Sequence, residues 1–110
     1  MAGFSQLAAL NAIDYSTLTV PVGAVTFASA SPAFSNGKVS GKTVRRCLIT
    51  SETDAVRWRA DGTAPTATEG HVMAKDTSLS MTGANYSQWI NSVQFIRVTN
   101  DAKLKITWFD

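Results

Sequence analysis

Residues 103–109 read KLKITWF, and polar and apolar side chains alternate in this stretch as far as Trp108. Successive side chains of a β-strand point to opposite faces, so Leu104, Ile106 and Trp108 share one face of the predicted strand. Two lysines and a threonine occupy the other face. The alternation therefore predicts a strand with one face on a hydrophobic core and the other face in solvent.

The chain from residue 17 onward repeats this pattern in short runs between turn signals. The pairs Asn36-Gly37 and Asp61-Gly62 tolerate the positive φ that tight turns need. Short strands at this spacing predict an all-β fold of about eight strands, either a jelly-roll or Greek-key sandwich or, as the alternative, a small barrel. The predicted strands are 17–20, 24–28, 43–50, 56–59, 72–73, 78–81, 92–99 and 103–109.

Residues 1–16 differ from the rest, because they are rich in alanine and Asp14 is their only ionisable side chain. This composition predicts a short helix or an apolar arm in front of a sandwich domain at 17–110. A weakly charged apolar terminus either packs on a partner or closes the core of its own domain, and both alternatives stay open. Apolar residues recur in the segment at a spacing near three: Phe4, Leu7, Leu10 and Ile13.

The length of 110 residues fits one domain. Hydrophobic residues make up 45% and charged residues 16% of the chain, which excludes a disordered charged tail. A net charge of +2 and a pI of about 8.9 are less basic than a nucleic-acid-binding domain usually is. No run approaches the ~20 apolar residues of a membrane span, and the first residues lack the basic start of a secretory signal. We therefore expect neither a nucleic acid nor a membrane as partner.

The sequence shows no constellation for catalysis or metal binding. His71 and Cys47 are the only histidine and cysteine, which leaves too few soft ligands for a structural zinc site. Cys47 lies among apolar residues of a predicted strand, where a buried inert thiol is the usual occupant. There is no Gly-x-Ser-x-Gly elbow, and the acids fall mostly in predicted turns. We therefore expect no enzymatic activity, no metal and no cofactor.

Basic side chains concentrate on the predicted strands, whereas acids concentrate in the turns. This distribution indicates either a cationic sheet surface for an acidic partner or the solvated outer face of a sandwich. Trp58 points to the opposite face of its strand from Arg57 and Arg59, so base stacking and phosphate contact would not occur together there. The basic residues on predicted strands are Arg45, Arg46, Arg57, Arg59, Arg97, Lys103 and Lys105.

Three tryptophans raise the alternative of carbohydrate binding, because flat indole faces stack on sugar rings. Trp58 and Trp108 lie in alternating apolar patterns, so we expect both in the core. Trp89 is flanked by polar residues in the stretch 85–92, NYSQWINS, in which we expect a short helical turn and an exposed indole. Tyr86 and Trp89 are the candidate sugar-binding residues of this alternative.

Two stretches, AVRWRADGTAPTATEGHVM at 55–73 and SVQFIRVTNDAKLKITWF at 92–109, resemble a family of small proteins encoded in tailed-bacteriophage genomes. Members read V-R-[WY]-R-x-D-G-T-x-P-T-A-x-x-G, followed by a strand that ends in F-I and a short strand with aromatic residues. The likeness covers about half of the chain, and the insert at 29–42 is longer than in the pattern. The matching residues are Val56, Arg57, Trp58, Arg59, Asp61, Gly62, Thr63, Pro65, Thr66, Ala67, Gly70, Phe95 and Ile96.

Small β-sandwich proteins of such phages include capsid decoration, or cement, proteins, which bind the outside of the mature shell and clamp neighbouring capsomers. The resemblance therefore implies a structural virion protein on the capsid surface, made in the host cytoplasm, with the major capsid protein as its partner. A carbohydrate- or receptor-binding module of a head fibre or tail is the alternative.

The matching motif assigns no contact residue, so the expected contacts come from the apolar arm and the arginine-bearing strands. A weakly charged apolar arm suits a permanent interface. We also expect a homo-oligomer, a dimer or trimer, because symmetric self-association would let one unit bridge two capsomers. The expected capsid-contact residues are Phe4, Leu7, Leu10, Arg45, Arg57 and Arg59.

Overall fold

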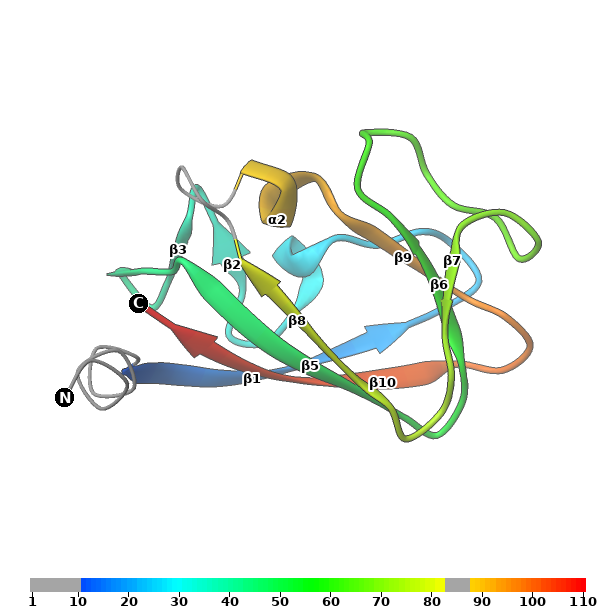
Figure 1. The fold of residues 1–110 in the computed structure, drawn as a ribbon, viewed down its shortest axis with the longest axis horizontal. Helices are drawn as coiled ribbons and strands as arrows, with labels where there is room; N and C mark the ends of the chain where they lie inside the picture. The colour runs from blue at the N-terminus through cyan, green and yellow to red at the C-terminus, as the bar shows by residue number, and fades with distance from the viewer. Residues whose placement is uncertain (1–10, 83–87) are drawn as a thin grey trace, which may run out of the picture.

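The computed structural model describes residues 11–82 and 88–110, which form an all-β chain, as predicted (Figure 1). The helical elements in this part of the chain are the 3-10 helix η1 (Phe27–Ser29) and the α-helix α2 (Gln88–Ser92). The strands are β1 (Ala12–Val20), β2 (Phe34–Ser35), β3 (Lys38–Val39), β4 (Lys42–Thr43), β5 (Arg46–Glu52), β6 (Val56–Arg59), β7 (His71–Met73), β8 (Ser78–Thr82), β9 (Gln94–Arg97) and β10 (Ala102–Phe109).

The strands form three antiparallel sheets. The large sheet has the order β1-β10-β5-β8, and the second sheet has the order β7-β6-β9. The chain passes from β5 to β6 and from β7 back to β8, so the β6–β7 hairpin belongs to one sheet while its two flanking strands pair in the other. The small sheet, β2-β3-β4, lies at the left in Figure 1, next to the carboxyl end of β10.

The stretch 103–109 forms most of β10, which pairs with β1 on one side and with β5 on the other. The side chains of Leu104, Ile106 and Trp108 are fully buried, whereas Lys103 is exposed. The predicted half-buried strand is therefore confirmed. Its interior position also gives both of its edges a backbone partner, which an edge strand lacks.

Four aromatic rings join the three sheets around Trp108. Its indole stacks on Phe34 of β2, with ring centroids 5.2 Å apart, and meets Phe27 of η1 edge-on at 5.1 Å. Phe27 in turn contacts Phe95 of β9, also at 5.1 Å. Such aromatic pairs contribute about 0.5–1.5 kcal/mol each beyond the burial of their area. One core therefore connects the large, the small and the second sheet.

The polar edge of this indole is bonded to a buried serine. The Nε1–H of Trp108 donates to Oγ of Ser16 at 2.7 Å, and the Ser16 hydroxyl donates to the carbonyl of Pro32 at 2.6 Å. Ser16 and Trp108 are both fully buried, so water cannot replace the bond between them. The chain of bonds fixes β1 and the segment around Pro32 against the central strand.

The strand β1 begins at Ala12, inside the predicted arm 1–16, so the predicted boundary lies too late in the chain. β10 offers backbone partners along this length, and the residues after Ala12 therefore extend the large sheet. A bulge between Ala12 and Asp14 interrupts the alternation that identifies a strand in sequence. The arm residues that were expected to contact the shell lie outside the described residues: Phe4, Leu7 and Leu10.

The segment 24–28 is not the strand that its sequence predicts. It contributes one isolated bridge, between Val25 and Phe95, and then enters η1. The hydroxyl of Thr26 accepts the backbone N–H of Ala28 at 3.2 Å, which caps the 3-10 helix. A capped 3-10 helix therefore forms here in place of a hydrogen-bonded strand, and the alternation of polar and apolar residues does not reveal the cap.

The predicted loop 29–42 contains the short strands β2 and β3 and the start of β4. The turn predicted at Asn36-Gly37 is confirmed, because both residues have positive φ, 53° and 74°. These short strands bring the described part of the chain to ten strands instead of about eight.

Replacing Ser16 by alanine tests the bond that anchors the core. The variant leaves the Trp108 Nε1–H and the Pro32 carbonyl without a partner, so we expect its free energy of unfolding to fall by about 1–3 kcal/mol. Urea unfolding measures this loss. Thr19→Ala, at an exposed position of the same strand, is the control and should change stability by less than about 0.5 kcal/mol. Equal losses for the two variants would contradict the anchoring role of Ser16.

Candidate functional site

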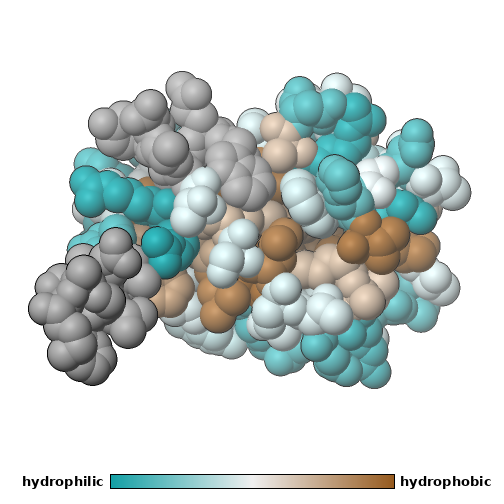
Figure 2. Space-filling view, viewed as in Figure 1, coloured by the Kyte–Doolittle hydropathy of each residue, from teal (hydrophilic) through white to brown (hydrophobic). Residues whose placement is uncertain are grey.

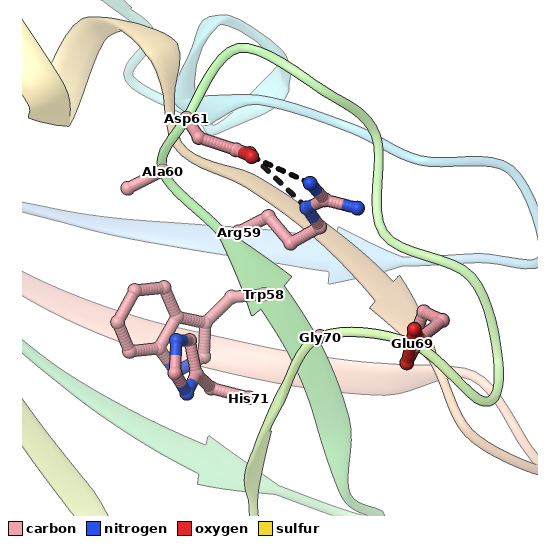
Figure 3. A pocket seen from close by; sticks show the side chains of 7 residues that line it. All are labelled: Trp58, Arg59, Ala60, Asp61, Glu69, Gly70 and His71. Atoms are coloured by element: carbon pink, nitrogen blue, oxygen red, sulfur yellow. Dashed lines mark hydrogen bonds and ion pairs between the residues drawn. The ribbon is translucent and has the colours of Figure 1, made fainter.

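A shallow open pocket of about 590 Å³ lies at the end of the β6–β7 hairpin (Figure 3). We call it the hairpin pocket. Its lining combines one indole, one imidazole, one guanidinium and two carboxylates within a single hairpin and the loop that joins its strands. The lining residues are Trp58, Arg59, Ala60, Asp61, Glu69, Gly70 and His71.

Two adjacent rings, tilted toward each other, form one side of the hairpin pocket. Trp58 of β6 and His71 of β7 are direct register partners, and their ring centroids lie 4.7 Å apart at an interplanar angle of 36°. Trp58 packs against the core without being fully buried, so its predicted core position holds only in part. His71 is exposed and leaves its edge available at the pocket.

An ion pair forms the polar side of the hairpin pocket, and Figure 3 shows it apart from the two rings. The guanidinium of Arg59 donates to both carboxylate oxygens of Asp61, at 3.1 Å and 2.5 Å. This contact lowers the pKa of the Asp61 carboxyl and raises the pKa of Arg59, so both groups stay charged at neutral pH. Asp61 also accepts the backbone N–H of Thr63 at 3.3 Å, as aspartates at turns commonly do.

The loop that closes the hairpin pocket is held by Arg57. Its Nε donates to the carbonyl of Ala67 at 2.9 Å, and its Nη1 donates to the carbonyl of Gly70 at 2.8 Å. Gly70 has a φ of +129°, and a Cβ there would lie only 3.0 Å from the Trp58 carbonyl oxygen. The loop therefore has a fixed path that brings Glu69 to the pocket, on a different side from the two rings (Figure 3).

The arginines expected to contact a shell do not share one surface. Arg57 and Arg59 lie on β6 of the second sheet, where loop carbonyls and Asp61 already bind them. Arg97 on β9 is paired with Asp101 at 2.5 Å. Arg45 is exposed and precedes β5, outside any strand. The basic residues of the predicted strands are thus divided between two sheets, and those of the second sheet have partners.

A different surface, which the sequence analysis missed, lies on the outer face of the large sheet. Tyr15 of β1 and Leu48 of β5 are 53% and 39% exposed on this face, and Thr107 of β10 lies between them in the register. The alternation of Thr17 and Thr19 with buried neighbours could have revealed it. The side chains of this outer face include Tyr15, Thr17, Thr19, Arg46, Leu48, Thr50, Glu52, Ser78, Ser80, Thr82, Lys103, Lys105, Thr107 and Phe109.

The candidate sugar-binding residues Tyr86 and Trp89 are not tested, because Tyr86 lies outside the described residues and the Trp89 side chain is not described.

Burial raises the pKa of the Cys47 thiol to about 12, which keeps it protonated and unreactive at neutral pH. Within residues 11–82 and 88–110, no group of three or more histidine, cysteine, aspartate and glutamate side chains could hold a metal ion. No helix in the same part of the chain is long and apolar enough to cross a membrane.

Comparison of the chain with protein-family models, with curated proteins and with solved structures finds no match in any of the three.

Replacing Arg57 by methionine tests whether this side chain holds the loop of the hairpin pocket. The carbonyls of Ala67 and Gly70 lose their donors, so we expect amide hydrogen exchange to rise at least tenfold at Glu69, whose N–H bonds Thr66 within the loop. Arg45→Met, at an exposed position outside the loop, is the control. Unchanged exchange at Glu69 would show that the loop keeps its path without Arg57.

The acid titration of Asp61 tests the ion pair. Its pKa is lowered in the folded state, so the pairing is present above the ordinary carboxyl pKa of 3.8 and is lost as the pH falls below it. We expect an NMR titration to give a midpoint below 3.8, and Arg59→Gln to return that midpoint toward 3.8. Arg97→Gln is the control and leaves the Asp61 midpoint unchanged. A midpoint insensitive to Arg59→Gln would rule out the pairing in solution.

Proposed function

We propose that the protein is a structural component of a bacteriophage particle, a capsid decoration protein that binds the assembled shell through the outer face of its large sheet. The observation that supports this proposal most directly is the exposure of Tyr15 and Leu48 on that face. The resemblance of 55–73 and 92–109 to small phage proteins supplies the partner, the major capsid protein.

The arrangement of the outer face suits protein contact. Tyr15, Thr107, Leu48 and Ser80 form one row across all four strands of the large sheet. Short hydroxyl side chains surround the tyrosine and the leucine, so a partner surface can approach both closely. Interfaces usually have such an apolar centre and a polar rim, and tyrosine is enriched among the residues that contribute most to binding.

Charge favours an acidic partner. Arg46, Lys103 and Lys105 lie on the outer face with Glu52 as the acid among its described residues. Lys103 and Glu52 are register partners, so their opposite charges largely offset each other. Arg46 and Lys105 therefore contribute most of the positive potential of the outer face. Complementary charge increases the rate of association and orients the partner more than it increases affinity.

Decoration would stabilise the shell by linkage. A protein that binds the assembled lattice but not the free subunits stabilises the lattice in proportion to its occupancy. A dimer or trimer of the chain would bridge capsomers and raise its own avidity without a new type of contact. Phe4, Leu7 and Leu10 remain candidate contacts in this proposal, and the homo-oligomer remains part of it.

Binding of purified variants to heads of the phage that encodes the chain, measured by co-sedimentation, tests the proposal. We expect Lys105→Glu to weaken binding at least tenfold, equivalent to about 1.4 kcal/mol, because it reverses a charge on the outer face. Lys38→Glu makes the same charge change on the small sheet and is the matched control. Leu48→Ser removes the exposed leucine and should weaken binding as well.

Two outcomes would contradict the proposal in distinguishable ways. Equal binding of Lys105→Glu, Leu48→Ser and the unchanged protein would contradict the outer face as the contact surface. Absence of any binding by the unchanged protein would contradict the decoration role. The combined variant Phe4→Ser, Leu7→Ser and Leu10→Ser tests the arm by itself, because these positions precede β1.

A further inference from the structure

The hairpin pocket has a chemistry that shell binding does not use. It lies on the second sheet and its connecting loop, whereas the outer face proposed for the shell belongs to the large sheet. Figure 2 shows hydrophobic surface over the region of β6 and β7, bordered by the hydrophilic surface of the loop between them. A ligand there and a partner on the large sheet would not compete for the same strands.

We propose that the hairpin pocket binds a neutral saccharide, with one sugar ring against the adjacent, mutually tilted rings of Trp58 and His71 and its hydroxyls on Asp61, Arg59 and Glu69. This is a binding function beyond shell decoration, and it uses a tryptophan other than the one singled out by the sequence.

The two rings supply the platform. The faces of aromatic rings carry negative potential and attract the weakly positive C–H groups on one face of a pyranose. The cross-strand pairing of Trp58 with His71 fixes the orientation of the indole at the mouth of the pocket. Arg57 and the close approach of Gly70 to the Trp58 carbonyl fix the loop beside it. Little ordering therefore remains to oppose binding.

The polar groups supply hydrogen bonds of both kinds. Carboxylates accept and guanidinium N–H groups donate. Arg59 uses two of its five N–H groups on Asp61, and Oδ2 of Asp61 accepts only one of these bonds, so each group keeps capacity for a ligand hydroxyl. The bond between Arg59 and Asp61 holds both groups in position before a ligand arrives. Glu69 is exposed on another side of the pocket, as Figure 3 shows, and can accept from a hydroxyl farther along the ring.

The charge of the lining selects the class of ligand. Asp61 and Glu69 carry two negative charges against the single positive charge of Arg59, so the pocket repels a phosphate or a carboxylate. One indole and one imidazole are too few for the aromatic cage that recognises a quaternary ammonium. The pocket is half polar in its lining groups, which disfavours a purely apolar ligand. A neutral polyhydroxylated ring satisfies all three conditions.

Fluorine NMR of the full chain labelled with 5-fluorotryptophan tests this proposal. Its three signals, from Trp58, Trp89 and Trp108, are assigned by single Trp→Phe replacements. D-glucose, D-galactose, N-acetylglucosamine and the anionic N-acetylneuraminic acid are titrated separately. We expect at least one neutral sugar to shift the Trp58 signal with a Kd on the order of 1 mM. The acidic sugar should leave the Trp58 signal in place.

Matched variants test whether the shift of the Trp58 signal arises from sugar bound in the hairpin pocket. Glu69→Gln and Asp61→Asn should each raise the Kd at least tenfold, because each removes a charged acceptor. Val72→Thr changes an exposed residue of β7 that does not line the pocket, and it should leave the Kd unchanged. If Asp61→Asn also lowers the midpoint of unfolding, the test depends on Glu69→Gln alone. Glu69 bonds the loop through its backbone N–H, and its side chain makes no hydrogen bond among the described residues that would hold the loop.

The proposal is overturned by any of four results. The first is a Trp58 signal that stays in place with all three neutral sugars, and the second is a shift of the Trp89 signal instead. The third is tightest binding by the acidic sugar, and the fourth is a Glu69→Gln variant that binds the neutral sugar as tightly as the unchanged protein.

Discussion

The burial of Trp108 is the constraint on which the rest of the structure depends. Its indole stacks on Phe34 and meets Phe27 edge-on, and through Phe27 it reaches Phe95 in the second sheet. Fully burying a side chain of this size contributes roughly 3 kcal/mol or more, but only if its N–H has a partner. Ser16 provides that partner. This bond joins β1 to β10 through their side chains, in addition to the backbone pairing of the two strands and the bridge between Thr17 and Ser31.

The same core explains why the two surfaces proposed to bind partners lie where they do. Because the inner face of the large sheet is committed to the core, its outer face must be left to solvent or to a partner. The second sheet is short, and β6 and β7 extend past the aromatic cluster to the hairpin pocket, where Trp58 contacts the core without full burial. Arg57, Gly70 and the buried Pro65 then shape the loop, which begins at Ala60 on the edge of the core.

Patterns of neighbouring residues predict those strands, turns and buried positions of this fold that depend mainly on residues close together in the sequence. Alternation identifies β10 and β6, the Asn-Gly pair identifies the turn before β3, and the apolar surroundings of Cys47 predict its burial. Alternation fails at the start of β1, where a bulge breaks the pattern, and at 24–28, where a cap and a single bridge replace a ladder. The hairpin pocket could not be predicted residue by residue, because only the pairing of β6 with β7 brings His71 onto Trp58. The bonding of Arg57 and Arg59 within the hairpin likewise depends on the fold of a loop that carries no periodic signal.

The central claim is that this chain is a decoration component of a phage particle. The most direct test of this proposal is quantitative mass spectrometry of purified phage particles whose genome contains this sequence, which compares the copy number of the chain with that of the major shell protein. Decoration of the lattice predicts a ratio near one, or a simple fraction of one set by capsid symmetry. A handful of copies per particle, or none, would contradict the claim.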